Sequence, residues 1–179
     1  IRDRKTVAHK DFDSLISATA KGQDVSTMER VYRWVAAFQM IGEKPVLGFG
    51  PGTFYSLYKN YAVSSFSTYV SDNPEKSGVH CYYLMTAVEQ GLIGLLIFLL
   101  LCFVVMLKGE EVYHRKDLDP FTKRIVMAAT LGFICIAAIN IVNDMVETDK
   151  VGSFFFVYMA LIVNIDIKSK QQRLEGAED

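Results

Sequence analysis

The feature that most constrains this chain is a long stretch without a charged side chain, from Gln90 to Leu107. From Gly91 onward it consists almost entirely of Leu, Ile, Phe, Val and Gly. An α-helix rises 1.5 Å per residue, so about 20 such residues cross the roughly 30 Å hydrocarbon core of a bilayer. The stretch therefore predicts a membrane-spanning helix, and the remaining segments must fold around it.

Two further apolar stretches predict two more spans. We expect the three transmembrane helices at about 85–107, 125–143 and 151–167, within a membrane region of residues 84–167, although Asp166 makes the last one less regular. The chain is 51% apolar and 22% charged, with a positive mean hydropathy, as alternating spans and polar loops require. The prediction is an all-α, polytopic membrane protein fragment. Because it opens on Ile1 without a signal pattern, we expect earlier N-terminal spans of the same chain to precede it.

Basic residues in the short loops predict the orientation. They gather between the first two spans and after the third, whereas only Lys150 lies between the second and third. By the positive-inside rule, the loop between the first two spans and the tail at 168–179 are cytoplasmic. Residues 1–83 then lie on the opposite side, which is the periplasm of a bacterium. The basic residues near the N-terminus oppose this assignment, but long segments are largely exempt from the rule.

The outer segment 1–83 has its own predicted organisation. Apolar residues at three- and four-residue steps predict an amphipathic helix at 27–41, in which Trp34 is an interface anchor. A turn rich in Gly and Pro follows at 45–54, and then a short helix at about 53–61. Residues 64–77 are rich in Ser, Asn, Asp and Pro and predict a polar loop.

The glycine turn allows two interpretations. Gly48, Gly50 and Gly52 alternate with other residues, and such glycines let backbone N–H groups approach a phosphate. The pattern is neither a Walker loop nor a dinucleotide fingerprint, since the flanking residues of both are missing. The simpler interpretation is a sharp corner between two interfacial helices.

His80 is the sharpest candidate for chemistry. It precedes the first span on the outer side, where an imidazole can move protons near neutral pH. A structural histidine is the common alternative. Arg30 and Arg33 on the amphipathic helix carry donors suited to phosphate oxygens, although lipid headgroups attract the same side chains. Glu89 follows within the first span, and either holds a partner or caps a neighbouring helix.

Other function classes are excluded or unsupported. The net charge of -1 provides no basic field for nucleic acid. Three scattered cysteines suit neither a disulfide framework nor a metal site, and no second ligand accompanies His80. Asn143, Asp144 and Glu147 form a short outer turn; they either line the same face as His80 or make a plain acidic turn.

Taken in order, these motifs resemble the O-antigen ligase/O-antigen polymerase family of bacterial membrane glycosyltransferases. The resemblance rests on an Arg-x-x-x-Trp helix, a Pro- and Gly-rich turn ending in Phe, a variable loop, His-x-x-Tyr-Leu, and Glu-x-Gly-x-x-Gly running into a span. In this sequence the matching residues are Arg30 and Trp34; Pro45, Gly48, Gly50, Gly52 and Phe54; His80, Tyr83 and Leu84; and Glu89, Gly91 and Gly94.

The resemblance implies a reaction at the periplasmic face of the bacterial inner membrane. A glycan leaves undecaprenyl pyrophosphate and joins an acceptor sugar hydroxyl, on lipid A core for a ligase or on a growing glycan for a polymerase. It implies His80 as general base and Arg30 as the group that stabilises the pyrophosphate. Substrate binding falls to Arg33, Gly50, Gly52, Tyr83 and Glu89. The reaction is expected to be inverting, without metal or other cofactor.

One residue departs from the family pattern, and one rival function remains. The family usually has Asn directly after the His, whereas this chain has Cys81, which leaves open how the imidazole is held. The rival is a non-enzymatic transporter segment or assembly subunit, in which His80 has no chemical role.

Overall fold

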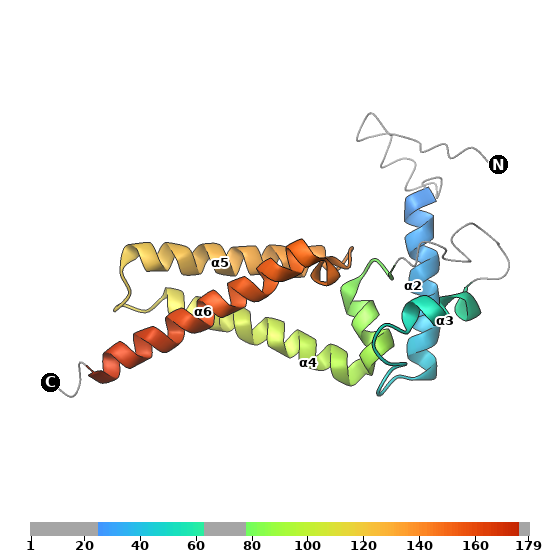
Figure 1. Cartoon of the computed structure of the whole chain (residues 1–179), viewed down its shortest axis with the longest axis horizontal. Coiled ribbons are helices and arrows are strands. Elements are labelled where there is room, and N and C mark those ends of the chain that lie inside the picture. Colours follow the sequence, from blue (N-terminus) through green and yellow to red (C-terminus); the bar gives the residue numbers. More distant parts are fainter. Residues whose placement is uncertain (1–24, 63–77, 176–179) are drawn as a thin grey trace, which may run out of the picture.

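The computed structural model describes residues 25–62 and 78–175, and all regular structure within them is helical. The predicted polar loop at 64–77 lies outside the described residues. The elements are α2 (Val25–Glu43), α3 (Phe54–Tyr61), α4 (Tyr82–Tyr113), α5 (Pro120–Ile139), the 3-10 turn η2 (Met145–Glu147) and α6 (Asp149–Glu175). Helices α4, α5 and α6 form an elongated bundle, and α2 runs crosswise at one end of it with α3 alongside (Figure 1).

The prediction of three spans is confirmed for the described residues. Tyr82–Tyr113, Pro120–Ile139 and Lys150–Glu175 are each long and apolar enough to cross a membrane. Large side chains along α4 face outward: Leu96 is 57% exposed, Ile97 62% and Phe103 57%. Such exposure on a soluble surface would be costly, whereas lipid accommodates it. The chain is therefore an all-helical membrane protein.

The bounds of the second span differ from the prediction of 125–143. Helix α5 begins earlier because Asp119 caps it, accepting hydrogen bonds from the backbone N–H groups of Phe121 and Thr122, with Pro120 in the first helical position. It ends at Ile139 rather than Asn143, because a turn begins at Asn140. The side-chain Oδ1 of Asn140 accepts a hydrogen bond from the Met145 N–H at 3.1 Å. Asn140 and Asn143 therefore belong to the outer turn.

The third span also runs further than predicted. Helix α6 continues to Glu175, so the first part of the predicted tail, 168–175, is helical. Its extension is held by ion pairs to the α4–α5 connection: Arg115 pairs with Asp166, and Arg173 pairs with Asp117. These contacts lie at the end of the bundle away from α2 (Figure 1).

Helix α4 is broken at Gly91, which has φ 71° and ψ -176°. A short first arm lies beside α2, and a long second arm runs through the bundle (Figure 1). The break leaves backbone groups unpaired, and the glycine turn pairs with them: Phe49 N donates to Val88 O at 2.9 Å, Gly50 N to Glu89 O at 2.8 Å, and Leu92 N to Pro45 O at 2.7 Å. The turn and the break therefore fold as one unit.

Two apolar cores stabilise the two ends of the molecule. The outer core joins α2, α3 and the first arm of α4 through Ala36, Met40, Phe54, Tyr58 and Met85, each at most 1% exposed. The bundle core is aromatic, with Phe133 and Phe155 stacked at 4.7 Å between ring centroids. Because α2 is anchored to the first arm of α4, its arginines are positioned relative to the residues that precede this arm.

Candidate functional site

His80 occupies a strained backbone position directly before α4. Its φ of 58° is the only positive value for a non-glycine residue among those described. The left-handed conformation costs of order 1 kcal/mol or more and persists only when neighbours hold it. Here the His80 N–H donates to Asp144 Oδ2 at 2.8 Å, from the turn after α5. Strain held in this way at a titratable residue is a mark of a functional position.

Arg33 brings a guanidinium to the imidazole. It lies on the inner face of α2 and is 5% exposed. Its Nη1 donates to Gly78 O at 2.8 Å and lies 3.4 Å from His80 Nε2. An arginine can only donate, so this contact is a hydrogen bond in the tautomer that carries its proton on Nδ1. Arg33 Nε is buried and has no hydrogen-bond partner among residues 25–62 and 78–175.

The surroundings of His80 favour its neutral form. Burial lowers the pKa of the imidazole below its ordinary value of 6.5, and the charge of Arg33 lowers it further. Arg30, one helical turn earlier on α2, acts in the same direction, whereas Asp144 and a side-chain hydrogen bond with Asn143 oppose it. The net effect keeps Nε2 unprotonated at neutral pH, as a general base requires.

Asp144 is the functional candidate that sequence reasoning left undecided. The structure puts it on the same face as His80. Burial raises the pKa of its carboxyl group, although its contacts with His80 lower it. Its Oδ1 is buried without a partner, and a Cβ at Gly78 would collide with its Oδ2. The sequence signal is a single acidic residue in a turn, which most turns contain, so only the packing singles it out.

The predicted glycine positions differ in what they do. The Gly50 N–H donates to Glu89 O at the break in α4. A Cβ at Gly48 would lie 2.6 Å from the Glu89 backbone. Both glycines therefore fit the interpretation of the turn as a structural corner. Gly52 has a positive φ of 72° and open space around the position of a Cβ. Of the two glycines named as substrate-binding candidates, Gly52 is the one with free surroundings.

Glu89 and Tyr83 hold helices together in this structure. Glu89 is 8% exposed, and its Oε1 accepts from the Phe54 N–H at 3.3 Å, so it caps the start of α3. The Tyr83 hydroxyl donates to Ala137 O at 2.9 Å, near the end of α5. Their polar groups are engaged within the protein. Of the predicted residues, Arg33 contacts the imidazole, and Arg30 acts on it through its charge.

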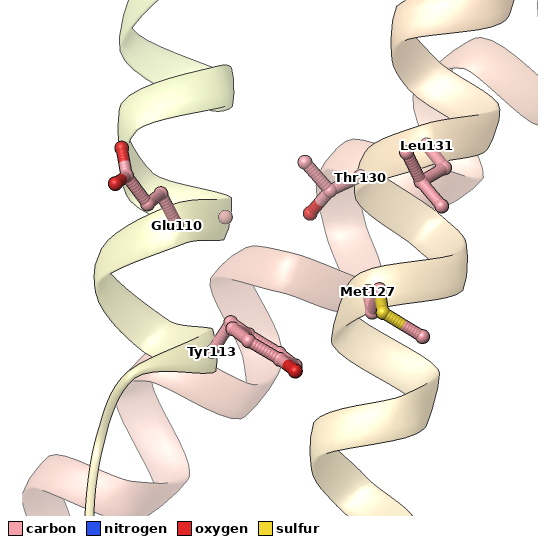
Figure 2. Close-up of a pocket in the computed structure, with 6 residues that line it drawn as sticks. Glu110, Tyr113, Met127, Thr130 and Leu131 are labelled. Carbon is pink, nitrogen blue, oxygen red and sulfur yellow. The ribbon is translucent and has the colours of Figure 1, made fainter.

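Other candidate sites are weaker. A shallow depression between α4 and α5 is lined by Glu110, Tyr113, Met127 and Thr130 (Figure 2), near the bundle end that carries Arg115. Figure 2 shows no convergence of polar groups there. Among residues 25–62 and 78–175, no group of three or more His, Cys, Asp or Glu side chains could hold a metal ion. The site around His80 differs from the depression in bringing charged side chains together around a titratable ring.

The fold and site together define a multi-pass helical membrane protein with an arginine–histidine site at one end of its spans. A family model described as O-antigen ligase matches residues 5–99, more than half of the chain. The chain therefore belongs to the O-antigen ligase family, and the resemblance drawn from its motifs is confirmed. No curated protein and no solved structure gave a significant match.

Proposed function

We propose that this protein transfers a glycan from undecaprenyl pyrophosphate to an acceptor sugar hydroxyl at the periplasmic face of the bacterial inner membrane. The observation that carries the proposal is the 3.4 Å approach of Arg33 Nη1 to His80 Nε2, at one end of the spans. Membership in the O-antigen ligase family supports a glycosyltransferase-like activity on lipid-linked glycans. The orientation rests on the basic loops, because the site lies at the end opposite Arg115 and Arg173.

His80 acts as the general base in this proposal. The acceptor hydroxyl replaces Arg33 Nη1 at Nε2 and gives its proton to this nitrogen while its oxygen bonds to the anomeric carbon of the donor. The bond from that carbon to the diphosphate oxygen breaks, and its electron pair leaves with the diphosphate. Attack from the face opposite the leaving group inverts the anomeric centre. A positioned base of this kind contributes typically 10²–10⁴-fold to the rate.

Arg30 and Arg33 have different electrostatic roles in this proposal. Arg30 is only half-buried and lies one turn from Arg33, so it can reach an anion arriving from the membrane surface. We assign Arg30 to the charge that develops on the departing diphosphate. Arg33 is buried against the imidazole, where its charge lowers the pKa of His80. Two guanidinium groups provide the positive charge that a diphosphate needs, without assigning a role to a metal.

The test is the loss of glycan transfer in the intact protein when His80 or Arg30 is removed. We expect His80→Ala to reduce transfer by about 10²–10⁴-fold and Arg30→Ala by about 10²–10³-fold. His114→Ala and Arg124→Ala are matched controls, because they remove the same side chains from the other end of the bundle. Protein level and membrane insertion are measured in parallel. Normal transfer by His80→Ala would dismiss the mechanism and favour a transporter or assembly subunit.

Surface polysaccharide on gels separates ligation from polymerisation. Loss of a ligase leaves the lipid A core without any added glycan. Loss of a polymerase leaves single repeats on the acceptor. Comparing the His80→Ala strain with the parent strain therefore identifies the acceptor class in the same experiment.

A further inference from the structure

The two arms of α4 have different surroundings. In the first arm, Met85 is 1% exposed and Val88 is fully buried, because both belong to the outer core with α2 and α3. Directly after the break, Leu92 is 50% exposed and Ile93 is 48% exposed. Residues 92–113 form a helix about 33 Å long, which is enough to cross a hydrocarbon core of about 30 Å. The second arm can therefore span the membrane alone, and the first arm is packed in protein rather than in lipid.

The turn after α2 presents two large apolar side chains beside the break in α4. Val46 is 57% exposed and Leu47 is 74% exposed, and we call these two residues the apolar corner. Pro45 O accepts from the Leu92 N–H at 2.7 Å, and a Cβ at Gly91 would lie 2.1 Å from Val46 O. Figure 1 shows this turn beside the bend of α4. The apolar corner therefore adjoins the first lipid-facing residues of the second arm.

Backbone contacts fix the conformation of the turn that carries the apolar corner. The Gly48 N–H donates to Lys44 O at 3.1 Å and closes the turn. The Phe49 N–H donates to Val88 O at 2.9 Å, and the Gly48 backbone lies too close to Glu89 for a side chain. The two apolar side chains are thus held at the surface by a rigid backbone. Together with the start of the second arm they extend one exposed apolar surface.

A basic residue flanks the apolar corner. Lys44 is exposed, and its Nζ lies 4.7 Å from the centroid of the Phe49 ring. At a membrane surface a lysine keeps its ammonium group among the headgroups while its stem covers apolar groups. The neighbouring acid, Glu43, accepts a hydrogen bond from the Tyr61 hydroxyl. Exposed apolar residues with a basic flank are typical of segments that insert shallowly into a bilayer.

The neighbours of the apolar corner favour lipid as its occupant over another protein segment or a second copy. The corner adjoins Leu92, where the spanning arm of α4 is already exposed to hydrocarbon. We propose that Val46 and Leu47 insert into the leaflet at the site end of the bundle, and that α4 enters this leaflet at Gly91. Helices α2 and α3 and the first arm of α4 then rest on the membrane surface.

Insertion of the apolar corner fixes the height of the candidate site above the membrane. Arg33 lies on α2 and His80 lies directly before the first arm, so both belong to the part that rests on the surface. The headgroup region lies at this level, and the diphosphate of a lipid-linked donor belongs to the same region. This consequence rests on the proposed function: the corner keeps the site within reach of a diphosphate that remains at the membrane surface.

The depth of the apolar corner can be measured without any activity assay. The intact protein, with its other cysteines replaced by Ser, carries a nitroxide at Leu47→Cys in vesicles of phosphatidylcholine and phosphatidylglycerol. We expect relaxation by oxygen, which concentrates in lipid, and little relaxation by a water-soluble nickel chelate. A nitroxide at Leu96→Cys is the lipid control, and one at Ser56→Cys, on the exposed side of α3, is the water control.

Two results of the depth measurement would overturn the proposal. Relaxation of the Leu47→Cys nitroxide by the nickel chelate, as at Ser56→Cys, would place the apolar corner in water. Protection from both oxygen and the chelate would mean that protein covers the corner, whether another span of the chain or a second copy.

A charge at the apolar corner tests the consequence for the donor. Leu47→Asp changes a side chain that is 74% exposed, so the outer core is unaffected and thermal unfolding in detergent should match the parent. With the donor embedded in vesicles, KM for the donor should rise severalfold while kcat is unchanged. Ser56→Asp adds the same charge on α3 and should leave KM unchanged. An unchanged KM in Leu47→Asp would overturn the role of the corner in donor access.

The outcomes separate this inference from the proposed function. If His80→Ala abolishes transfer while the Leu47→Cys nitroxide lies in water, the proposed base stands and membrane insertion of the corner falls. If His80→Ala retains transfer, the proposed function falls, and the depth measurement still decides whether the corner inserts.

Discussion

In the described part of the chain, one arginine is buried near each end of the helix bundle. The two arginines differ in the partners that surround the guanidinium group. Arg115 is 8% exposed and is surrounded by acceptors: Asp166, Glu111 at 2.9 Å, and the Ser169 hydroxyl. Arg33 is 5% exposed, and its hydrogen-bond contacts among the described residues are a backbone carbonyl and an imidazole; Asp144 interacts with it through charge, without a described ion pair. Its Nε has no partner.

The difference distinguishes a completed structural contact from an arginine suited to a ligand. A buried guanidinium that meets two carboxylates has its charge neutralised and joins two elements, here the α4–α5 connection and α6. A buried guanidinium beside a neutral base has charge to spare for an anion. Burial alone therefore does not identify function; the partners of the buried charge do.

The largest expected effect is on Arg115. Arg115→Ala leaves the buried Asp166 with the more exposed Lys170 as its cationic partner, at 3.0 Å, and should destabilise the protein by about 3 kcal/mol, the low end for a broken buried pair. The double variant Arg115→Met with Asp166→Leu should recover most of that loss, because no charge is left unpaired. Thermal unfolding in detergent measures both. Glycan transfer per folded molecule should match the parent; a specific loss of transfer would break the contrast between the two ends.

The next effect concerns Arg33. Its charge lowers the pKa of His80, so Arg33→Gln should raise that pKa. The base works only when deprotonated, and transfer falls as the pH drops through its pKa. The acidic limb of the pH profile should therefore move to higher pH in Arg33→Gln. Arg115→Ala is the control without a shift. A limb that stays in place in Arg33→Gln would show that Arg33 does not govern the base.

The smallest effect is expected at Cys81. Asn is among the best N-cap residues, whereas Cys81 makes no side-chain capping hydrogen bond with α4. Cys81→Asn adds a capping group but buries its amide in the outer core, so the free energy of unfolding should change by less than about 1 kcal/mol, measured by thermal unfolding, and the acidic limb should stay unchanged. A shift of that limb would mean that the side chain at position 81 acts on the imidazole.

Local patterns carried a large part of the fold. Long stretches with few or no charged residues predicted three spans, because lipid tolerates few alternatives to an apolar helix. Apolar residues spaced three and four positions apart around Trp34 predicted α2. The helix extends slightly beyond 27–41 at both ends. The end of α5 was missed because Asn140 and Asn143 are uncharged and fit a span by composition. Their role as turn residues depends on contacts with Met145 and Tyr82.

The sequence by itself determined the helical class, the number of spans in the described part, and the candidates His80, Arg30 and Arg33, since each follows from the chemistry of a residue and its near neighbours. Tertiary structure alone decided that Arg33 contacts the imidazole, and that Asp144, which follows two spans later in the chain, accepts the His80 backbone N–H. Glu89 was likewise assigned to capping α3 only by packing. These contacts join segments far apart in the chain, and the geometry that brings them together is set by the break at Gly91 and the turn that docks on it.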